Sequence, residues 1–142
     1  MLVRLLYASR AAQPLSPEMI EGILAQSRAH NPEQGITGIL CYSGDIFMQV
    51  LEGGRDAVCE LYNLIVRDER HRNVRLLSFE EIRERRFASW TMGQVNLAKI
   101  NPSFMLKYAE KAELDPFCVS GAASMALLDD LIATASVLGR AS

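Results

Sequence analysis

Residues 46–51 form an uninterrupted, mostly apolar run, Ile-Phe-Met-Gln-Val-Leu, and this run constrains the fold more than any other segment. Successive side chains of a β-strand point to opposite faces, so the even-numbered Ile, Met and Val would lie on one face. Phe47 and Leu51 would lie on the other face. A strand that is apolar on both faces is typical of a sheet with both faces covered, so the chain has to provide two covers.

The other periodic segments predict the elements of the sheet and its first cover. Ser16-Pro17 offers an N-cap and a proline at the first helical position. Ser43-Gly44-Asp45 predicts a tight turn that joins its flanking strands into a hairpin. Strands are predicted over residues 2–8, 35–42, 46–51, 74–79 and 90–95, helices over about residues 17–31 and around residues 58–65, and a charged loop over residues 68–73.

This order, β-α-β-β-α-β-β, predicts an α+β fold, a ferredoxin-like sandwich with one added strand and both helices on one face of a single sheet. The second cover is expected from the tail after Asn101-Pro102. Residues 103–113 and 122–138 show helical spacing, so we expect C-terminal helices packed on the second sheet face or on a partner. The stripe of the longer helix consists of Leu128, Leu131, Ile132 and Ala135. This divides the chain into a domain over residues 1–98 and a helical extension over residues 99–142.

Composition excludes several classes of function. The 142 residues include 49% hydrophobic residues, enough for the core of one domain, and 15 Lys and Arg against 17 Asp and Glu leave no basic footprint for nucleic acid. No apolar run approaches the ~20 residues that span a bilayer, and the N-terminus does not resemble a signal peptide, so a cytoplasmic protein without membrane partners is expected. The three cysteines, Cys41, Cys59 and Cys118, form no disulfide framework and no metal pattern.

Gln49 is the one polar residue within the apolar strand. It shares a face with Phe47 and Leu51, and an unpaired buried amide costs about 1–3 kcal/mol, so it should have partners. Periodicity alone favours a core glutamine bonded to backbone groups; the alternative is a ligand contact. Ordinary structural roles also explain the other polar or aromatic candidates: Tyr7 on a strand expected to be central, Ser27 and Asn31 near a helix end, Arg70 and His71 in a charged run, and Trp90 and Met92 at one strand parity.

Patterns of known catalytic sites are absent from the sequence. There is no Gly-x-Ser-x-Gly and no phosphate-binding loop, since residues 52–55, Glu-Gly-Gly-Arg, lack the lysine and serine. His30 and His71 are too few and too far apart for a convincing metal site. Composition and spacing alone therefore predict a soluble domain of helices and strands with one unexplained glutamine.

Six short segments, taken together in their order along the chain, carry more information about function than composition and spacing do. The segments are Leu-Tyr-Ala-Ser at 6–9, His-Asn-Pro at 30–32, Gly-Ile-Thr-Gly-Ile-Leu at 35–40, Phe-Met-Gln-Val-Leu-Glu-Gly at 47–53, Asp-Glu-Arg-His at 68–71 and Arg-Arg-Phe-Ala-Ser-Trp-Thr-Met at 85–92. None is specific alone, but their order and spacing over residues 1–98 closely resemble the BLUF family of blue-light sensors that use flavin.

The resemblance implies a bound flavin, FAD or else FMN, between the two helices. Ile23 and Ile65 would sandwich the ring, and Asn31 would anchor its pyrimidine edge. Gln49 would bond near flavin N5 and O4 and also to Tyr7. Arg70 and His71 would contact the ring or the ribityl chain, and Trp90 and Met92 would lie near Gln49. The implied cofactor-binding set is Tyr7, Ile23, Ser27, Asn31, Gln49, Ile65, Asp68, Arg70 and His71, with no metal ligand.

The resemblance also implies a photochemical switch in place of an enzyme reaction. Tyr7 would give an electron and then a proton, and Gln49 would rotate or tautomerise, so that the flavin ends chemically unchanged with different hydrogen bonds. Trp90 and Met92 would be the remaining switch residues. No output domain fits in residues 99–142, so the signal is expected to pass to a separate protein or through a change in a homo-oligomer.

Two other classes of function remain open at this point. One is a ferredoxin-like regulatory module that binds a small metabolite through Gln49 and Asn31. The other is an enzyme of acylphosphatase type, which uses Arg and Asn on a similar sandwich. Against the enzyme, Arg10 and Arg55 lack a recognisable phosphate-cradling loop.

Overall fold

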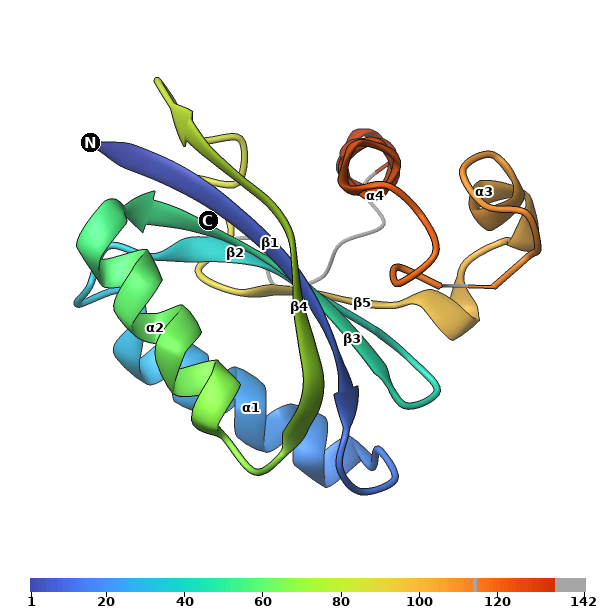
Figure 1. The fold of residues 1–142 in the computed structure, drawn as a ribbon, viewed down its shortest axis with the longest axis horizontal. Coiled ribbons are helices and arrows are strands. Elements are labelled where there is room, and N and C mark those ends of the chain that lie inside the picture. The colour runs from blue at the N-terminus through green and yellow to red at the C-terminus, as the bar shows by residue number, and fades with distance from the viewer. Residues whose placement is uncertain (114, 135–142) are drawn as a thin grey trace.

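The computed structural model describes residues 1–113 and 115–134 (Figure 1). Its element order confirms the predicted α+β fold with the order βαββαββ followed by C-terminal helices. The elements are β1 (Leu2–Ala11), α1 (Pro17–His30), β2 (Thr37–Ser43), β3 (Ile46–Gly54), α2 (Arg55–Arg67), β4 (His71–Ile82), β5 (Gly93–Asn96), a 3-10 helix (Leu97–Lys99), α3 (Pro102–Leu106) and α4 (Gly121–Ala133).

The strands form a five-stranded sheet in the order β4-β1-β3-β2-β5. β1 lies between β4 and β3 and pairs with both in antiparallel fashion, whereas β2 pairs with β5 in parallel. Tyr7 is therefore on an interior strand, as predicted. In the β1–β3 register Tyr7 lies directly opposite Gln49, so the two residues share one face of the sheet.

Both faces of the sheet are covered, as the run at residues 46–51 predicts. Phe47 and Leu51 belong to a core cluster with residues of α1 and α2, on what we call the helix side. Met48 and Val50 belong to a second cluster with residues of the tail, on what we call the tail side. Figure 1 shows α1 and α2 on one side of the sheet and α3 and α4 on the other.

Local signals set the element ends. The Ser16 side chain accepts a hydrogen bond from Met19 N at 3.1 Å and caps α1, which begins with Pro17. Gly44 has a φ of +60° in the turn between β2 and β3, a conformation that suits glycine. Within the described part of the chain, no helix combines the length and the apolar character needed to cross a membrane.

Several element bounds differ from those predicted. β4 begins at His71, so the second half of the segment expected as a charged loop, residues 71–73, is strand, because its backbone pairs with the far end of the long strand β1. β5 covers only Gly93–Asn96, since residues 83–92 run irregularly before it. α3 ends at Leu106, well short of residue 113. α4 is close to the predicted helix, although the predicted residues 135–138, including Ala135, lie outside the described residues.

The tail meets the sheet at an irregular point of β4. The β1–β4 register shifts between Leu6 and Tyr7, opposite the step from Ser78 to Leu76, which leaves Leu77 as an extra residue in β4. Gly121, the first residue of α4, lies so close to this point that an added Cβ would be 2.5 Å from the Leu77 carbonyl oxygen. Only glycine fits there without a shift of the helix or the strand.

We expect Gly121→Ala to lower the free energy of unfolding by about 1–3 kcal/mol, because the new methyl group overlaps backbone atoms. Gly22→Ala is the matched control, since an added Cβ in the middle of α1 meets nothing within 4 Å. That change should raise stability by up to about 1 kcal/mol. Chemical denaturation of the two variants measures the difference, and equal effects of the same sign would contradict the close packing at Leu77.

Candidate functional site

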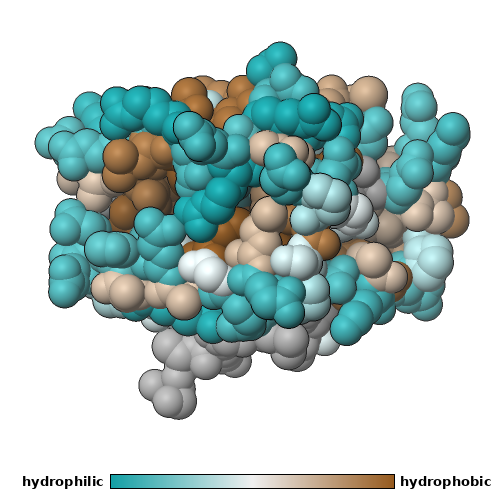
Figure 2. All heavy atoms as spheres, turned by 90° about the horizontal axis from the view of Figure 1, so that it is seen from below, coloured by the Kyte–Doolittle hydropathy of each residue, from teal (hydrophilic) through white to brown (hydrophobic). Residues whose placement is uncertain are grey.

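A cavity of about 380 Å³ lies between α1 and α2, with β1 and β3 beneath it, a volume within the usual range for small-molecule sites. Figure 2 looks onto the side of α1 and α2 and shows brown apolar atoms in a hollow between hydrophilic residues. Every residue of the predicted cofactor-binding set lines this cavity. They are Tyr7, Ile23, Ser27, Asn31, Gln49, Ile65, Asp68, Arg70 and His71.

Sequence reasoning missed other lining residues. Gln26 and His30 complete an i, i+3, i+4, i+7 stripe with Ile23 and Ser27 along α1, a spacing that could have identified them. The remaining additions come from α2 and from the turn after α1, where no comparable signal separates cavity residues from surface residues. They are Gln34, Ile36, Ala57, Glu60, Leu61 and Leu64.

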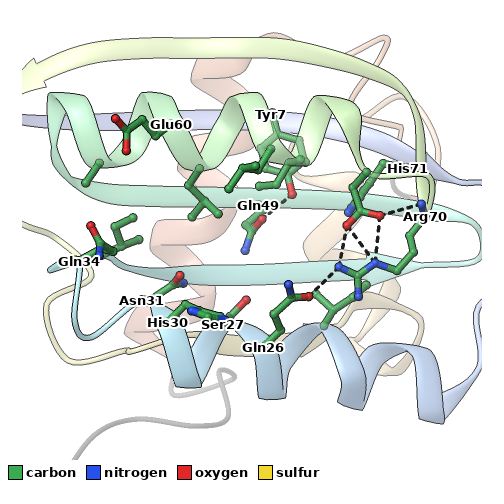
Figure 3. A pocket seen from close by; sticks show the side chains of 17 residues that line it. Tyr7, Gln26, Ser27, His30, Asn31, Gln34, Gln49, Glu60, Arg70 and His71 are labelled. Carbon is green, nitrogen blue, oxygen red and sulfur yellow. Dashed lines mark hydrogen bonds and ion pairs between the residues drawn. The ribbon is translucent and has the colours of Figure 1, made fainter.

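Tyr7 and Gln49 form a hydrogen-bonded pair at the floor of the cavity, with side chains that are 1% and 4% exposed (Figure 3). The Tyr7 hydroxyl donates to Gln49 Oε1, and Gln49 Nε2 donates to Met92 Sδ at 3.2 Å. The partners of Gln49 are thus side chains, in contrast to the backbone partners that periodicity alone favours. A thioether is a weak acceptor and the amide carries two N–H hydrogens, so Gln49 can also bond a molecule in the cavity.

Burial raises the pKa of the Tyr7 phenol well above its ordinary value, and the negative charge of Asp68 raises it further. Because of this raised pKa, Tyr7 stays a neutral hydrogen-bond donor across the physiological pH range. Desolvation also raises the pKa of Tyr62 and that of Tyr42. The acceptor of the Tyr7 hydroxyl is the amide oxygen of Gln49, an arrangement in which the phenolic proton has one defined path.

Asn31 presents an unsatisfied amide to the cavity wall. Its backbone N–H donates to Ser27 O at 2.8 Å and its carbonyl accepts from Ile36 N at 2.9 Å, which fixes the residue at the end of α1. The side chain is 3% exposed, and its Nδ2 has no hydrogen-bond partner among residues 1–113 and 115–134. A buried donor without a partner costs about 1–3 kcal/mol, so a ligand acceptor at this point would be stabilised.

Arg70 lies at one end of the cavity (Figure 3), and its ion-pair partner Asp68 also lines the cavity. The Asp68 carboxylate accepts from Arg70 N at 2.9 Å and from Nη2 at 2.6 Å, and these hydrogen bonds lower its pKa. Arg70 Nη2 also donates to Gln26 Oε1 at 2.8 Å, which joins the start of β4 to α1. The guanidinium is thus held at the rim by groups of both walls.

His71 is the first residue of β4 and packs beneath the cavity. Its Nδ1 lies 2.8 Å from Ser9 Oγ, and its ring centroid lies 5.0 Å from that of Phe47. Burial lowers the pKa of His71 below its ordinary value of 6.5, although the nearby Asp68 carboxylate acts in the opposite direction. The imidazole is therefore neutral at neutral pH.

Trp90 and Met92 do not share a face, contrary to their common parity in the sequence. Met92 packs in the helix-side cluster next to Gln49, whereas Trp90 packs in the tail-side cluster. The prediction of a common face is wrong because both residues precede β5 in the irregular segment 83–92, where side chains do not alternate as in a strand. Of the two residues expected near Gln49, the structure brings only Met92 into contact with it.

Comparison with known proteins agrees with this geometry. The family model "BLUF: Sensors of blue-light using FAD" matches residues 2–93. The photoactivated adenylate cyclase subunit beta of Euglena gracilis is 37% identical over 92 residues, which are 64% of this chain and 11% of that protein. The chain thus spans about a tenth of the length of this curated relative.

Two solved structures match almost end to end. The dark-state structure of BlrB, a BLUF protein, has 36% identity and a TM-score of 0.77, and the match covers 94% of this chain and 96% of that chain. The photo-activated state of BlsA has 30% identity and a TM-score of 0.80, and the match covers 93% and 95%. The fold and the family match thus define the class as a domain of the type described as sensors of blue light using FAD. The chain belongs to the BLUF family.

Acid should destabilise the protein through His71. The unfolded histidine takes up a proton near pH 6.5 and the folded one resists it, so the free energy of unfolding should fall as pH drops below about 6.5. In His71→Gln this part of the pH dependence should disappear. Chemical denaturation between pH 5 and pH 8 measures it, with His30→Gln as the control that retains His71. Identical pH profiles for wild type and His71→Gln would contradict the assignment.

Proposed function

We propose that this chain senses blue light with a flavin bound between α1 and α2, and that the Tyr7–Gln49–Met92 hydrogen-bond chain is its switch. The observation that carries the proposal is this chain of side chains at the cavity floor. It joins a neutral phenol, an amide and a residue of the segment that leads to β5. FAD is the flavin in the family's description, and FMN carries the same ring.

The cavity residues suit a flavin ring. Ile23 of α1 and Ile65 of α2 give apolar side chains to the two helical walls, which suits a flat aromatic ring. The ring edge offers acceptors and a donor, and the amides of Asn31 and Gln49 can match both kinds. The unsatisfied Asn31 Nδ2 supports this assignment, because a ring carbonyl would supply its missing acceptor. Ser27, Asp68, Arg70 and His71 complete the proposed binding set.

A bound flavin would supply one chemistry here, a strong oxidant formed when it absorbs blue light. Tyr7 is the proposed electron donor. Loss of an electron makes its phenol strongly acidic, and the proton then moves along the hydrogen bond to Gln49 Oε1. Gln49 rotates or tautomerises before Tyr7 recovers its electron and a proton. The lasting change is the set of hydrogen bonds that Gln49 makes.

The segment 90–92 is the proposed output, because it crosses between the two faces of the sheet. Met92 accepts from Gln49 on the helix side, and two residues earlier Trp90 packs on the tail side. The tail-side cluster that contains Trp90 also contains Leu127, Leu128 and Leu131 of α4. A change at Gln49 would therefore alter the packing of α4, and from there a separate signalling protein or a second copy of the chain.

Gln49→Leu should bind flavin but lose the light-induced shift, because leucine removes the amide that accepts from Tyr7 and donates to Met92. Tyr7→Phe should lose it as well, since the phenol is gone. Tyr62→Phe is the control, because its ring lies 5.9 Å from that of Tyr7 but does not line the cavity. Absorption spectra before and after blue light measure the outcome.

The wild-type protein should be yellow and show a small, reversible red shift. A normal shift in Gln49→Leu would contradict the switch assignment. Stabilisation by a small metabolite without any light response would instead support the metabolite-binding module.

Asn31→Ala should weaken flavin binding about 5- to 150-fold, which corresponds to about 1–3 kcal/mol for one hydrogen bond to a buried group. The stability of the flavin-free protein should not fall, because alanine removes a donor that lacks a partner there. Titration of flavin-free protein with FAD in the dark measures the affinity. Glu33→Ala is the control, because Glu33 is exposed in the same turn and does not line the cavity. Unchanged affinity in Asn31→Ala would refute its role as an anchor.

A further inference from the structure

Glu52 is a fully buried carboxylate, with 0% exposure, on the tail side of β3 and outside the cavity. We propose that Glu52 is a positioning residue that fixes residues 85–92 against the sheet and so sets Met92 opposite Gln49. The part of this inference that concerns light rests on the proposed function. The anchoring itself does not depend on it.

Both oxygens of Glu52 bind backbone N–H groups of the irregular segment. Oε1 accepts from Phe87 N at 2.6 Å, and Oε2 accepts from Arg86 N at 3.1 Å. These amides precede β5, so no strand ladder satisfies them, and the carboxylate takes that place with charge-assisted hydrogen bonds. The side chain of Arg85 adds a contact to the sheet, from Nη1 to Thr37 Oγ1 at 3.1 Å.

Arg4 neutralises the buried charge. Its Nε and Nη2 lie 2.8 Å and 2.7 Å from Glu52 Oε2, and the two residues are direct partners in the β1–β3 register. The same guanidinium reaches Glu80 of β4 at 2.8 Å. Because a buried ion pair adds little net stability compared with apolar packing, its geometry points to a role in fixing conformation.

The segment held by Glu52 ends at the switch. Trp90 N donates to Phe87 O at 3.1 Å, which forms a turn directly after the anchored amide. Gly38 N donates to Trp90 O at 2.9 Å, and two residues later Met92 Sδ accepts from Gln49. Glu52 of β3 thus holds the start of the segment, and Gln49 of β3 contacts its end. Without the carboxylate, the start of this segment loses two of its attachments, and Met92 loses its defined place.

Three variants separate anchoring from general stability. Glu52→Gln keeps the size and removes the charge, while Glu52→Asp keeps the charge for Arg4 but shortens the reach to the segment. Glu52→Asp therefore keeps the test decisive if Glu52→Gln does not fold. Glu80→Gln is the matched control, because it removes the other carboxylate that binds Arg4 but makes no hydrogen bond to residues 85–92 among those the structure describes.

The first readout is hydrogen exchange of flavin-free protein in the dark. Amides of residues 86–92 should exchange about tenfold faster or more in both Glu52 variants, and at the wild-type rate in Glu80→Gln. The second readout is thermal recovery of flavin-loaded protein after blue light. The recovery rate should change about threefold or more in Glu52→Asp. In a protein that already carries Met92→Leu, adding Glu52→Asp should leave the recovery rate unchanged.

Unchanged exchange in both Glu52 variants, or equal acceleration in Glu80→Gln, would overturn the anchoring role. Faster exchange with a wild-type recovery rate would overturn the positioning of the switch. A wild-type protein that binds flavin but shows no photocycle would refute the proposed function instead. In that case the exchange result would still decide whether Glu52 holds the segment.

Discussion

The hydrogen bond between Tyr7 and Gln49 is the interaction on which the site depends. It joins two polar side chains that lie opposite each other on interior strands, among the apolar residues of the helix-side cluster. Neither group could be buried alone without losing hydrogen bonds to water, so each makes the burial of the other possible. The same burial raises the pKa of Tyr7 and keeps its proton available to Gln49. The hydrogen bond thus gives the proposed proton transfer a defined donor and a defined acceptor.

Two-sided burial of the sheet protects this pairing. A slip of one residue between β1 and β3 would move every side chain of a strand to the opposite face, and both faces are packed. Three positions from the Tyr7–Gln49 pair, on the other face, the Arg4–Glu52 ion pair joins the same two strands. Gly38 adds a further constraint, since an added Cβ would lie 2.0 Å from Val50 O. The register that places Tyr7 opposite Gln49 is therefore fixed from both faces.

Local sequence signals were sufficient to predict the helices α1 and α2, the β2–β3 hairpin and the need for two covers. The helices follow from apolar spacing and the Ser16-Pro17 cap, the hairpin from the turn residues 43–45, and the covers from a strand that is apolar on both faces. The start of β4 escaped prediction, since this edge strand is held by backbone pairing and its exposed residues carry no hydrophobic pattern. Trp90 and Met92 could not be assigned to faces because parity applies only within a regular strand. Glu52 was hidden for another reason: besides Arg4, its partners are backbone amides 34 and 35 residues away, which no side-chain pattern reveals.

The cavity and the tail lie on opposite faces of a sheet, so a signal from one to the other has to cross a packed layer. Packed cores do not deform continuously, and a crossing is easier where a single segment contributes side chains to both faces. Residues 90–92 form such a segment, with Met92 on one face and Trp90 on the other. β3 also contributes side chains to both faces, with Gln49 on one and Met48 on the other, but its backbone pairing with β1 and β2 holds it in place. The irregular segment has fewer such restraints, and this difference favours it as the proposed route by which a change at Gln49 would reach α4.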